Sequence, residues 1–320
     1  MAILVIGGNG FIGRKLVKCL LQDKKVSSVV SMDITLPKEG FVRSIAEYSS
    51  RFHFVRGDIS VLEDTLTAIK KYSIEQIVNL AYLMVLESEE MPRDVAKVNV
   101  LGMSNAFEAA RLLGVPRVIY NSSNAVYGPQ STYGDKEVTE DDLLNPSSVY
   151  GITKQLNERM AAKYSELYGT RIIGLRPAFG FGHGREAAVV SDYFSGIVSL
   201  PAIGKPMFID VEGSSGFTLI CNDDIVNLTK ILLEAPSPKY DMYNLAGPYT
   251  SLEQVAKQVR QYIPEARIEF GHKAGLKGVK TISMARSREE FGFSLTPLKD
   301  AVLIHINDAR EEAGLEPLRV

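Results

Sequence analysis

The sequence predicts an α/β protein with helices on both faces of a doubly wound, mostly parallel sheet, joined to a second, smaller α/β domain. Over roughly the first 180 residues, short apolar runs alternate with longer amphipathic stretches. A glycine-rich turn follows the first run, and the alternation ends after Arg176-Pro177. Strands that alternate with covering helices are typical of a parallel sheet.

Six apolar runs, each bounded by polar or glycine residues, predict buried strands. They lie at residues 3–6, 29–32, 53–55, 77–80, 118–121 and 172–175. Four other stretches have apolar residues three to four positions apart, which is typical of helices that cover a sheet. These helices are expected at 13–22, 62–72, 95–113 and 150–168.

The second domain is expected to begin where a glycine-rich stretch, residues 178–185, follows Pro177. A later run, residues 240–247, could be one more strand that returns to the first sheet. We therefore expect one domain of residues 1–177 plus about 217–247, and a substrate-binding domain of about 178–216 plus 248–320.

The composition is that of a globular protein, with 320 residues, 45% hydrophobic and 23% charged. The formal net charge of −2 and the scattered Lys and Arg residues argue against nucleic-acid or membrane partners, so a small molecule is the expected substrate. No run reaches the roughly 18 apolar residues of a membrane span. The two cysteines, Cys19 and Cys221, lie in apolar runs and predict buried thiols in a reducing, cytoplasmic setting.

The glycine-rich turn reads Gly7-Gly8-Asn9-Gly10-Phe11-Ile12-Gly13 and lies between the first strand and the first helix. Glycine allows a sharp turn, a close approach to a pyrophosphate and tight packing of helix on strand, while helix N–H groups receive the phosphate charge. Glycine clusters also mark ordinary strand-to-helix turns. The combination of strand, turn, helix and a following acid favours a dinucleotide site.

That acid is Asp33, twenty residues past Gly13, at the end of the second run. Its carboxylate can accept hydrogen bonds from the adenosine ribose and would repel a 2′-phosphate, so NAD is predicted rather than NADP. The alternative is an ordinary surface acid. Asp58 is a candidate for binding the adenine amino group, and a helix-capping role before Leu62 is equally compatible with its position.

Tyr150 and Lys154 stand four residues apart on a predicted helix and therefore share one face. A nearby ammonium favours the phenolate form of a tyrosine, which can then exchange a proton with a substrate hydroxyl. Ser123 follows the fifth strand, at the edge where open sheets bind ligands. Tyr and Lys at this spacing usually mark a solvated helix face, but their combination with Ser123 is much less common by chance.

These residues resemble the extended short-chain dehydrogenase/reductases, also called the NAD-dependent epimerase/dehydratase family. The match rests on the glycine turn, Asp33, Asp58-Ile59, Asn99, Ser122-Ser123-x-x-Val126-Tyr127-Gly128, Asn145-Pro146-x-Ser148-x-Tyr150-Gly151-x-Thr153-Lys154 and Arg176-Pro177. The resemblance implies a Rossmann-like first domain and a catalytic set of Ser123, Tyr150, Lys154 and Asn99, with Asn99 linking Lys154 to solvent through water. It implies NAD binding by Gly7, Gly10, Phe11, Ile12, Gly13, Asp33, Asp58, Ile59, Leu80, Ala81, Tyr82, Asn99, Tyr150, Lys154 and Pro177.

The sequence departs from the family pattern where a nucleotide-sugar would bind. Phe179 stands where such members usually carry Asn. Residues 217–225 fill the region of the family's late V-x-D motif without the Arg that usually stands ahead of it. Ser123-Asn124-Ala125 replaces the Thr-Asp-Glu of the dehydratases. Candidate substrate residues are Met84, Ser123, Asn124, Ala125, Phe179, His183 and Arg185. His183 and Arg185 fit a loop with solvated charges equally well. Met84 fits ordinary packing equally well.

The leading hypothesis is an NAD-dependent oxidoreductase that interconverts a secondary alcohol and a ketone on a small or sugar-like substrate. The alternatives are a sugar or nucleotide-sugar 4-epimerase of the UDP-glucose type and a non-catalytic NAD-binding sensor or scaffold. No catalytic metal is expected, because the four histidines stand apart without Cys or carboxylate at ligand spacing. The resemblance also suggests a homodimer that packs the helices at 95–113 and 150–168 against a second copy.

Overall fold

The computed structural model describes residues 1–184, 189–275 and 278–319. Its main sheet has seven parallel strands. In spatial order they are β10 (Met242–Leu245), β6 (Arg171–Pro177), β5 (Arg117–Asn121), β4 (Gln76–Asn79), β1 (Ala2–Ile6), β2 (Ser28–Asp33) and β3 (Phe52–Arg56). The strand order reverses between β1 and β4, as in a doubly wound Rossmann sheet, so the predicted fold class is confirmed.

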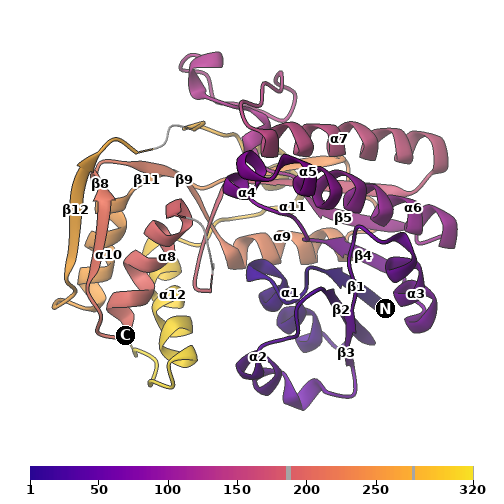
Figure 1. Cartoon of the computed structure of the whole chain (residues 1–320), viewed down its shortest axis with the longest axis horizontal. Coiled ribbons are helices and arrows are strands. Elements are labelled where there is room, and N and C mark those ends of the chain that lie inside the picture. The colour runs from indigo at the N-terminus through magenta and orange to yellow at the C-terminus, as the bar shows by residue number, and fades with distance from the viewer. Residues whose placement is uncertain (185–188, 276–277, 320) are drawn as a thin grey trace.

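Helices cover both faces of this sheet (Figure 1). Side chains alternate along β1, so Ile3 and Val5 pack with α1 (Phe11–Gln22) and α9 (Asn222–Glu234). Leu4 and Ile6 face α3 (Leu62–Tyr72) and α6 (Met103–Leu113), beside α7 (Val149–Tyr168). Burial on both faces explains why the strands read as uninterrupted apolar runs.

The helix predicted at 95–113 is instead three consecutive segments. They are α5 (Pro92–Val95), a π-helix η2 (Ala96–Gly102) and α6. Gly102 packs against Ile59 so closely that a Cβ would lie 2.8 Å from the isoleucine side chain. Short elements without a clear period were not predicted: α2 (Glu39–Ser44), η1 (Ala46–Tyr48), α4 (Val85–Glu90), η3 (Asn124–Val126) and η4 (Gln130–Thr132).

Two small sheets and three helices form a second body, at the left of Figure 1. One small sheet contains β7 (Phe179–Phe181), β9 (Gly216–Cys221) and β11 (Tyr249–Ser251), and another pairs β8 (Met207–Val211) with β12 (Ile268–Lys273). Helices α8 (Val189–Ala202), α10 (Leu252–Tyr262) and α12 (Leu298–Glu312) share a core with these strands, and α11 (Ala285–Phe291) packs beside β10. The strand at 240–247 lies in the main sheet as β10, whereas β9 lies in the second body. The exact division into domains stays a prediction.

The two bodies are joined by charged contacts from α1. Lys15 Nζ lies 2.8 Å from a carboxylate oxygen of Asp223 on α9 and 2.7 Å from one of Asp308 on α12. Arg14 Nη2 donates to the Gly184 carbonyl at 3.2 Å. The helix that follows the glycine turn is therefore tied directly to the second body. No helix in the described ranges has the length and apolar character needed to cross a membrane.

Candidate active site

The glycine turn forms a cradle that has no room for side chains. Gly7 has φ +76°, and a Cβ on it would lie 2.8 Å from the backbone nitrogen of Ala81. A Cβ on Gly8 would lie 2.3 Å from Ser31 Oγ, and one on Gly13 would lie 2.2 Å from the Gly7 carbonyl oxygen. Gly10, which directly precedes the first turn of α1, has no side chain that could cap this turn. Such a helix N-terminus fits a pyrophosphate, so these residues fit NAD.

Asp33 is held beside this turn by three hydrogen bonds. The backbone N–H of Asn9 donates to Oδ2 at 3.1 Å, and the N–H and hydroxyl of Thr35 donate to Oδ1 at 3.1 and 2.9 Å. The carboxylate therefore lies next to the glycine cradle, as a ribose-binding acid requires. Asp58 accepts hydrogen bonds from the N–H and hydroxyl of Ser60 at 2.8 and 2.7 Å, which is a local turn contact. Its adenine-binding role stays a prediction.

The segment after β4, residues 80–83, closes the cradle from the other side. Ala81 N–H donates to Asn79 Oδ1 at 3.0 Å. Asn99 clamps Leu83, because its Oδ1 accepts from the Leu83 N–H at 2.8 Å and its Nδ2 donates to the Leu83 carbonyl at 3.0 Å. Both ends of the Asn99 amide are thus engaged. The water link from Asn99 to Lys154 stays a prediction.

The first turn of α7 brings Tyr150 to the segment that carries Ser123. Ser148 caps this helix by accepting from the Gly151 N–H at 3.0 Å. Gly151 lies so close to η3 that a Cβ would be 2.7 Å from the Ala125 carbonyl oxygen. Ser123 directly precedes η3, and its Oγ accepts from the Ala125 N–H at 3.1 Å. The side chains of Ser123 and Tyr150 are therefore buried on neighbouring segments.

Lys154 is completely buried one helical turn beyond Tyr150. Its Nζ donates to the Asn121 carbonyl at 2.8 Å and lies 4.3 Å from the ring centre of Tyr82 and 5.4 Å from that of Tyr150. Burial lowers the pKa of Lys154 to about 7, although the charge of Glu158 acts to raise it. Lys154 thus titrates close to neutral pH, unlike an exposed lysine.

The predicted substrate residues do not form one cluster. Phe179 on β7 stacks on Phe217 with ring centres 5.0 Å apart and packs with the core of the second body. His183 contacts Ser199 Oγ on α8 at 2.9 Å and Glu312 Oε2 on α12 at 3.0 Å. Arg185 lies outside the described residues.

The remaining predicted substrate residues, Met84 and residues 123–125, lie on segments next to the glycine cradle or next to Tyr150. Asn124 begins η3 immediately after Ser123, and Met84 follows the clamped residue Leu83 and is partly buried. In the described part of the chain, no group of three or more His, Cys, Asp or Glu side chains is placed to hold a metal ion.

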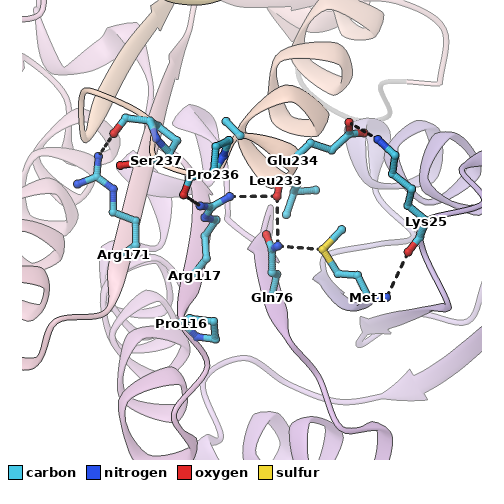
Figure 2. Close-up of a pocket in the computed structure, with 12 residues that line it drawn as sticks. Met1, Lys25, Gln76, Pro116, Arg117, Arg171, Leu233, Glu234, Pro236 and Ser237 are labelled. Atoms are coloured by element: carbon cyan, nitrogen blue, oxygen red, sulfur yellow. Dashed lines mark hydrogen bonds and ion pairs between the residues drawn. The ribbon is translucent and has the colours of Figure 1, made fainter.

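A cavity of about 640 Å³ lies at the other end of the main sheet and is distinct from this site (Figure 2). It is bordered by Gln76 and Arg117, which begin β4 and β5, whereas the segment 80–83 and Ser123 follow the carboxyl ends of those strands. Arg117 donates to the carbonyls of Leu232, Leu233 and Pro236 at 2.8, 3.0 and 3.1 Å. Its guanidinium thereby caps the C-terminal end of α9.

Sequence reasoning missed a buried charged pair behind Lys154. Glu158, on the next turn of α7, binds Arg176 of β6 through two hydrogen bonds of 2.9 and 2.8 Å. Its position eight residues after Tyr150 on the same helix face was the available signal. The family pattern includes Arg176 but assigns it no partner.

Comparison with known proteins agrees with this geometry. The sequence profile described as "NAD dependent epimerase/dehydratase family" matches residues 3–246. A UDP-glucose 4-epimerase from Mycolicibacterium smegmatis is 34% identical over 234 residues, which are 71% of this chain and 71% of that protein. A D-erythronate dehydrogenase from Cupriavidus necator is 28% identical over 214 residues, or 64% of this chain and 63% of that protein. The chain spans 55% of the length of a relative from Methanocaldococcus jannaschii.

Among solved structures, a GalE-like L-threonine dehydrogenase from C. necator in its holo form has the same fold, with a TM-score of 0.83. It is 22% identical, and the match covers 96% of this chain and 99% of that one. The fold and the site define an enzyme that works with a bound dinucleotide. The chain belongs to the NAD-dependent epimerase/dehydratase family, the extended short-chain dehydrogenase/reductases, and its cofactor is NAD.

Proposed function

We propose that the protein is an NAD-dependent dehydrogenase that interconverts a secondary alcohol and a ketone. The observation that carries this proposal is the burial of Tyr150 and Lys154 on one face of α7, directly against the segment of Ser123. Bound NAD supplies the hydride acceptor. Tyr150 would exchange a proton with the substrate hydroxyl, Ser123 would donate a hydrogen bond to the reacting oxygen, and Lys154 in its charged form would favour the tyrosine phenolate.

The substrate that fits best is small or sugar-like and lacks a diphosphate. Phe179 offers an aromatic ring where a diphosphate would require an amide, and Phe194 and Phe217 surround that ring with centres 5.4 and 5.0 Å away. Asn124 and Ala125 carry no carboxyl group, so a dehydratase reaction lacks its acid and base. Met84 and His183 remain proposed substrate residues at the border of the site.

An epimerase is the second candidate, and the 34%-identical UDP-glucose 4-epimerase favours it. An epimerase returns the hydride to its own substrate and needs no added cofactor to turn over. Incubation with UDP-glucose or UDP-galactose in the absence of added NAD separates the two functions. Appearance of the 4-epimer would replace the dehydrogenase proposal.

The direct test is a panel of secondary alcohols, including hydroxy acids and free sugars, assayed by formation of NADH. Tyr150→Phe should lower turnover roughly a thousandfold, because general acid–base catalysis is lost, while NAD still binds. Tyr168→Phe, a change at an exposed position of the same helix, is the matched control. An unchanged rate in Tyr150→Phe would overturn the proposal. NAD binding without turnover of any alcohol or sugar would instead indicate a sensor or scaffold.

A homodimer and a reducing, cytoplasmic setting are part of the same proposal. Exposed apolar side chains on α6 and α7 support the dimer: Leu112 is 48% exposed, Ile152 54% and Leu156 45%. The thiols of Cys19 and Cys221, which form no disulfide, support the reducing setting. Sedimentation of the wild type and of Ile152→Glu tests the dimer. Equal monomeric mass for both would reject it.

A further inference from the structure

Glu158 is a buried carboxylate that links helix α7 to strands β5 and β6 of the main sheet. Its side chain, on α7, is only 7% exposed, and that of Arg176, on β6, is 6% exposed. The Arg176 guanidinium donates to both oxygens of Glu158, and the Ser122 hydroxyl at the end of β5 donates to Oε1 at 2.5 Å. Paired hydrogen bonds of this kind fix both the position and the orientation of a carboxylate.

The spacing along α7 places Glu158 next to the reacting groups. Tyr150, Lys154 and Glu158 are each four residues apart and therefore lie in a row on one helix face. The Lys154 ammonium is completely buried, and burial of a cation favours its neutral form unless a negative charge lies nearby. Glu158 supplies such a charge one helical turn away.

We propose that Glu158 is a positioning residue for the reaction: its carboxylate, held by Arg176 and Ser122, keeps the Lys154 side chain charged and so sets the pH at which Tyr150 becomes a base. This inference rests on the proposed dehydrogenase function. It assigns a role to a residue that touches neither the reacting oxygen nor the hydride.

Among the described residues, the other groups around this row do not act as a second negative charge on Lys154. Burial raises the pKa of Tyr120 on β5 well above its ordinary value and that of Tyr127, after η3, to about 12, so both phenols are neutral at neutral pH. Tyr127 receives a hydrogen bond from Arg176 Nη1 at 2.7 Å. The groups that complete the surroundings are Tyr82, whose ring lies over Lys154, and Glu140, which meets Arg176 through its backbone carbonyl and has its carboxylate 3.7 Å from Arg286.

The test measures the pKa of Lys154 directly. Protein labelled with ¹³C at lysine Cε is titrated by NMR, and Lys154→Arg identifies the signal. Glu158→Gln should lower the pKa of Lys154 by about one unit, because the negative charge that raises this pKa is removed. A merely structural effect of the change would loosen the packing around Lys154 and would instead raise its pKa toward 10.5.

Glu166→Gln is the matched control, because Glu166 is on the same helix, its side chain is 63% exposed and its ion pair is with Lys163. It should leave the pKa of Lys154 unchanged. An unchanged or raised pKa in Glu158→Gln would overturn the inference.

Kinetics with an identified substrate provide the second readout. In Glu158→Gln the acid limb of kcat/KM for alcohol oxidation should move to higher pH, because a neutral Lys154 no longer favours the phenolate. If the wild type is active and the acid limb of Glu158→Gln lies at the same pH as that of the wild type, the inference is also overturned. Absence of turnover in the wild type would instead reject the proposed function, and the NMR titration would still decide the role of Glu158.

Discussion

Replacement of Lys154 by methionine should stabilise the folded protein while it abolishes turnover. Burial lowers the pKa of Lys154 from 10.5 to about 7, against the opposing effect of Glu158. At about 1.4 kcal/mol per pKa unit, the buried ammonium costs about 5 kcal/mol at a pH below 7. Methionine leaves the Asn121 carbonyl without its donor, which costs about 2 kcal/mol. The expected net gain in the free energy of unfolding is therefore about 3 kcal/mol.

The pH dependence of this gain has a definite sign. The pKa of Lys154 is lower in the folded than in the unfolded protein, so the unfolded protein binds more protons between pH 7 and pH 10.5. The wild type therefore becomes more stable as the pH rises through this window. The advantage of Lys154→Met is largest at or below pH 7 and shrinks toward pH 10.5.

Equilibrium urea unfolding, followed by circular dichroism at about pH 6 and about pH 9, measures both quantities. Lys163→Met is the control, because the Lys163 side chain is 68% exposed on the same helix. It should change the stability little at either pH. A Lys154→Met protein that is less stable than the wild type at the lower pH, or equally stabilised at both, would refute the reasoning.

Three further outcomes follow from the cofactor cradle. Gly7→Ala should lower the affinity for NAD, measured by calorimetry, more than about tenfold, because φ +76° and the 2.8 Å approach to Ala81 both exclude a methyl group. Asp33→Asn should weaken NAD binding and reduce the preference for NAD over NADP, since the charge that repels a 2′-phosphate is gone. An unchanged ratio of the NAD and NADP affinities would count against binding of the ribose by Asp33. Asn99→Ala should speed amide hydrogen exchange at Leu83 about tenfold, because both bonds to its backbone are lost, and unchanged protection there would contradict the clamp.

Most strands could be predicted from the sequence because their residues are buried on both faces. The run at 3–6 became Ala2–Ile6 and the run at 172–175 became Arg171–Pro177, each within two residues. The π-helix could not be predicted in this way. Its pitch depends on tertiary contacts, the packing of Gly102 on Ile59 and the clamp of Asn99 on Leu83, which no local period encodes.

In the site, too, local patterns could be predicted from the sequence and contacts between distant residues could not. The glycine turn and the pair of Tyr150 and Lys154 are local patterns, so their spacing could be found in the sequence. Glu158 and Arg176 are eighteen residues apart on different elements, and nothing in the sequence marks them as partners. The contacts of His183 with Ser199 and Glu312 join three distant segments, which is why a substrate-binding role could be suggested but its actual neighbours could not.

The π-helical segment Ala96–Gly102 makes this part of the chain sensitive to insertions and deletions rather than to substitutions. A π-turn holds about one residue more than an α-turn. Deletion of one residue would let an ordinary α-helix run through the segment and rotate Asn99 by about 100° away from Leu83. Exposed positions such as Lys97 accept other side chains without that rotation. In a population of homologous sequences, the length of this segment would therefore be kept more strictly than the identity of its exposed residues.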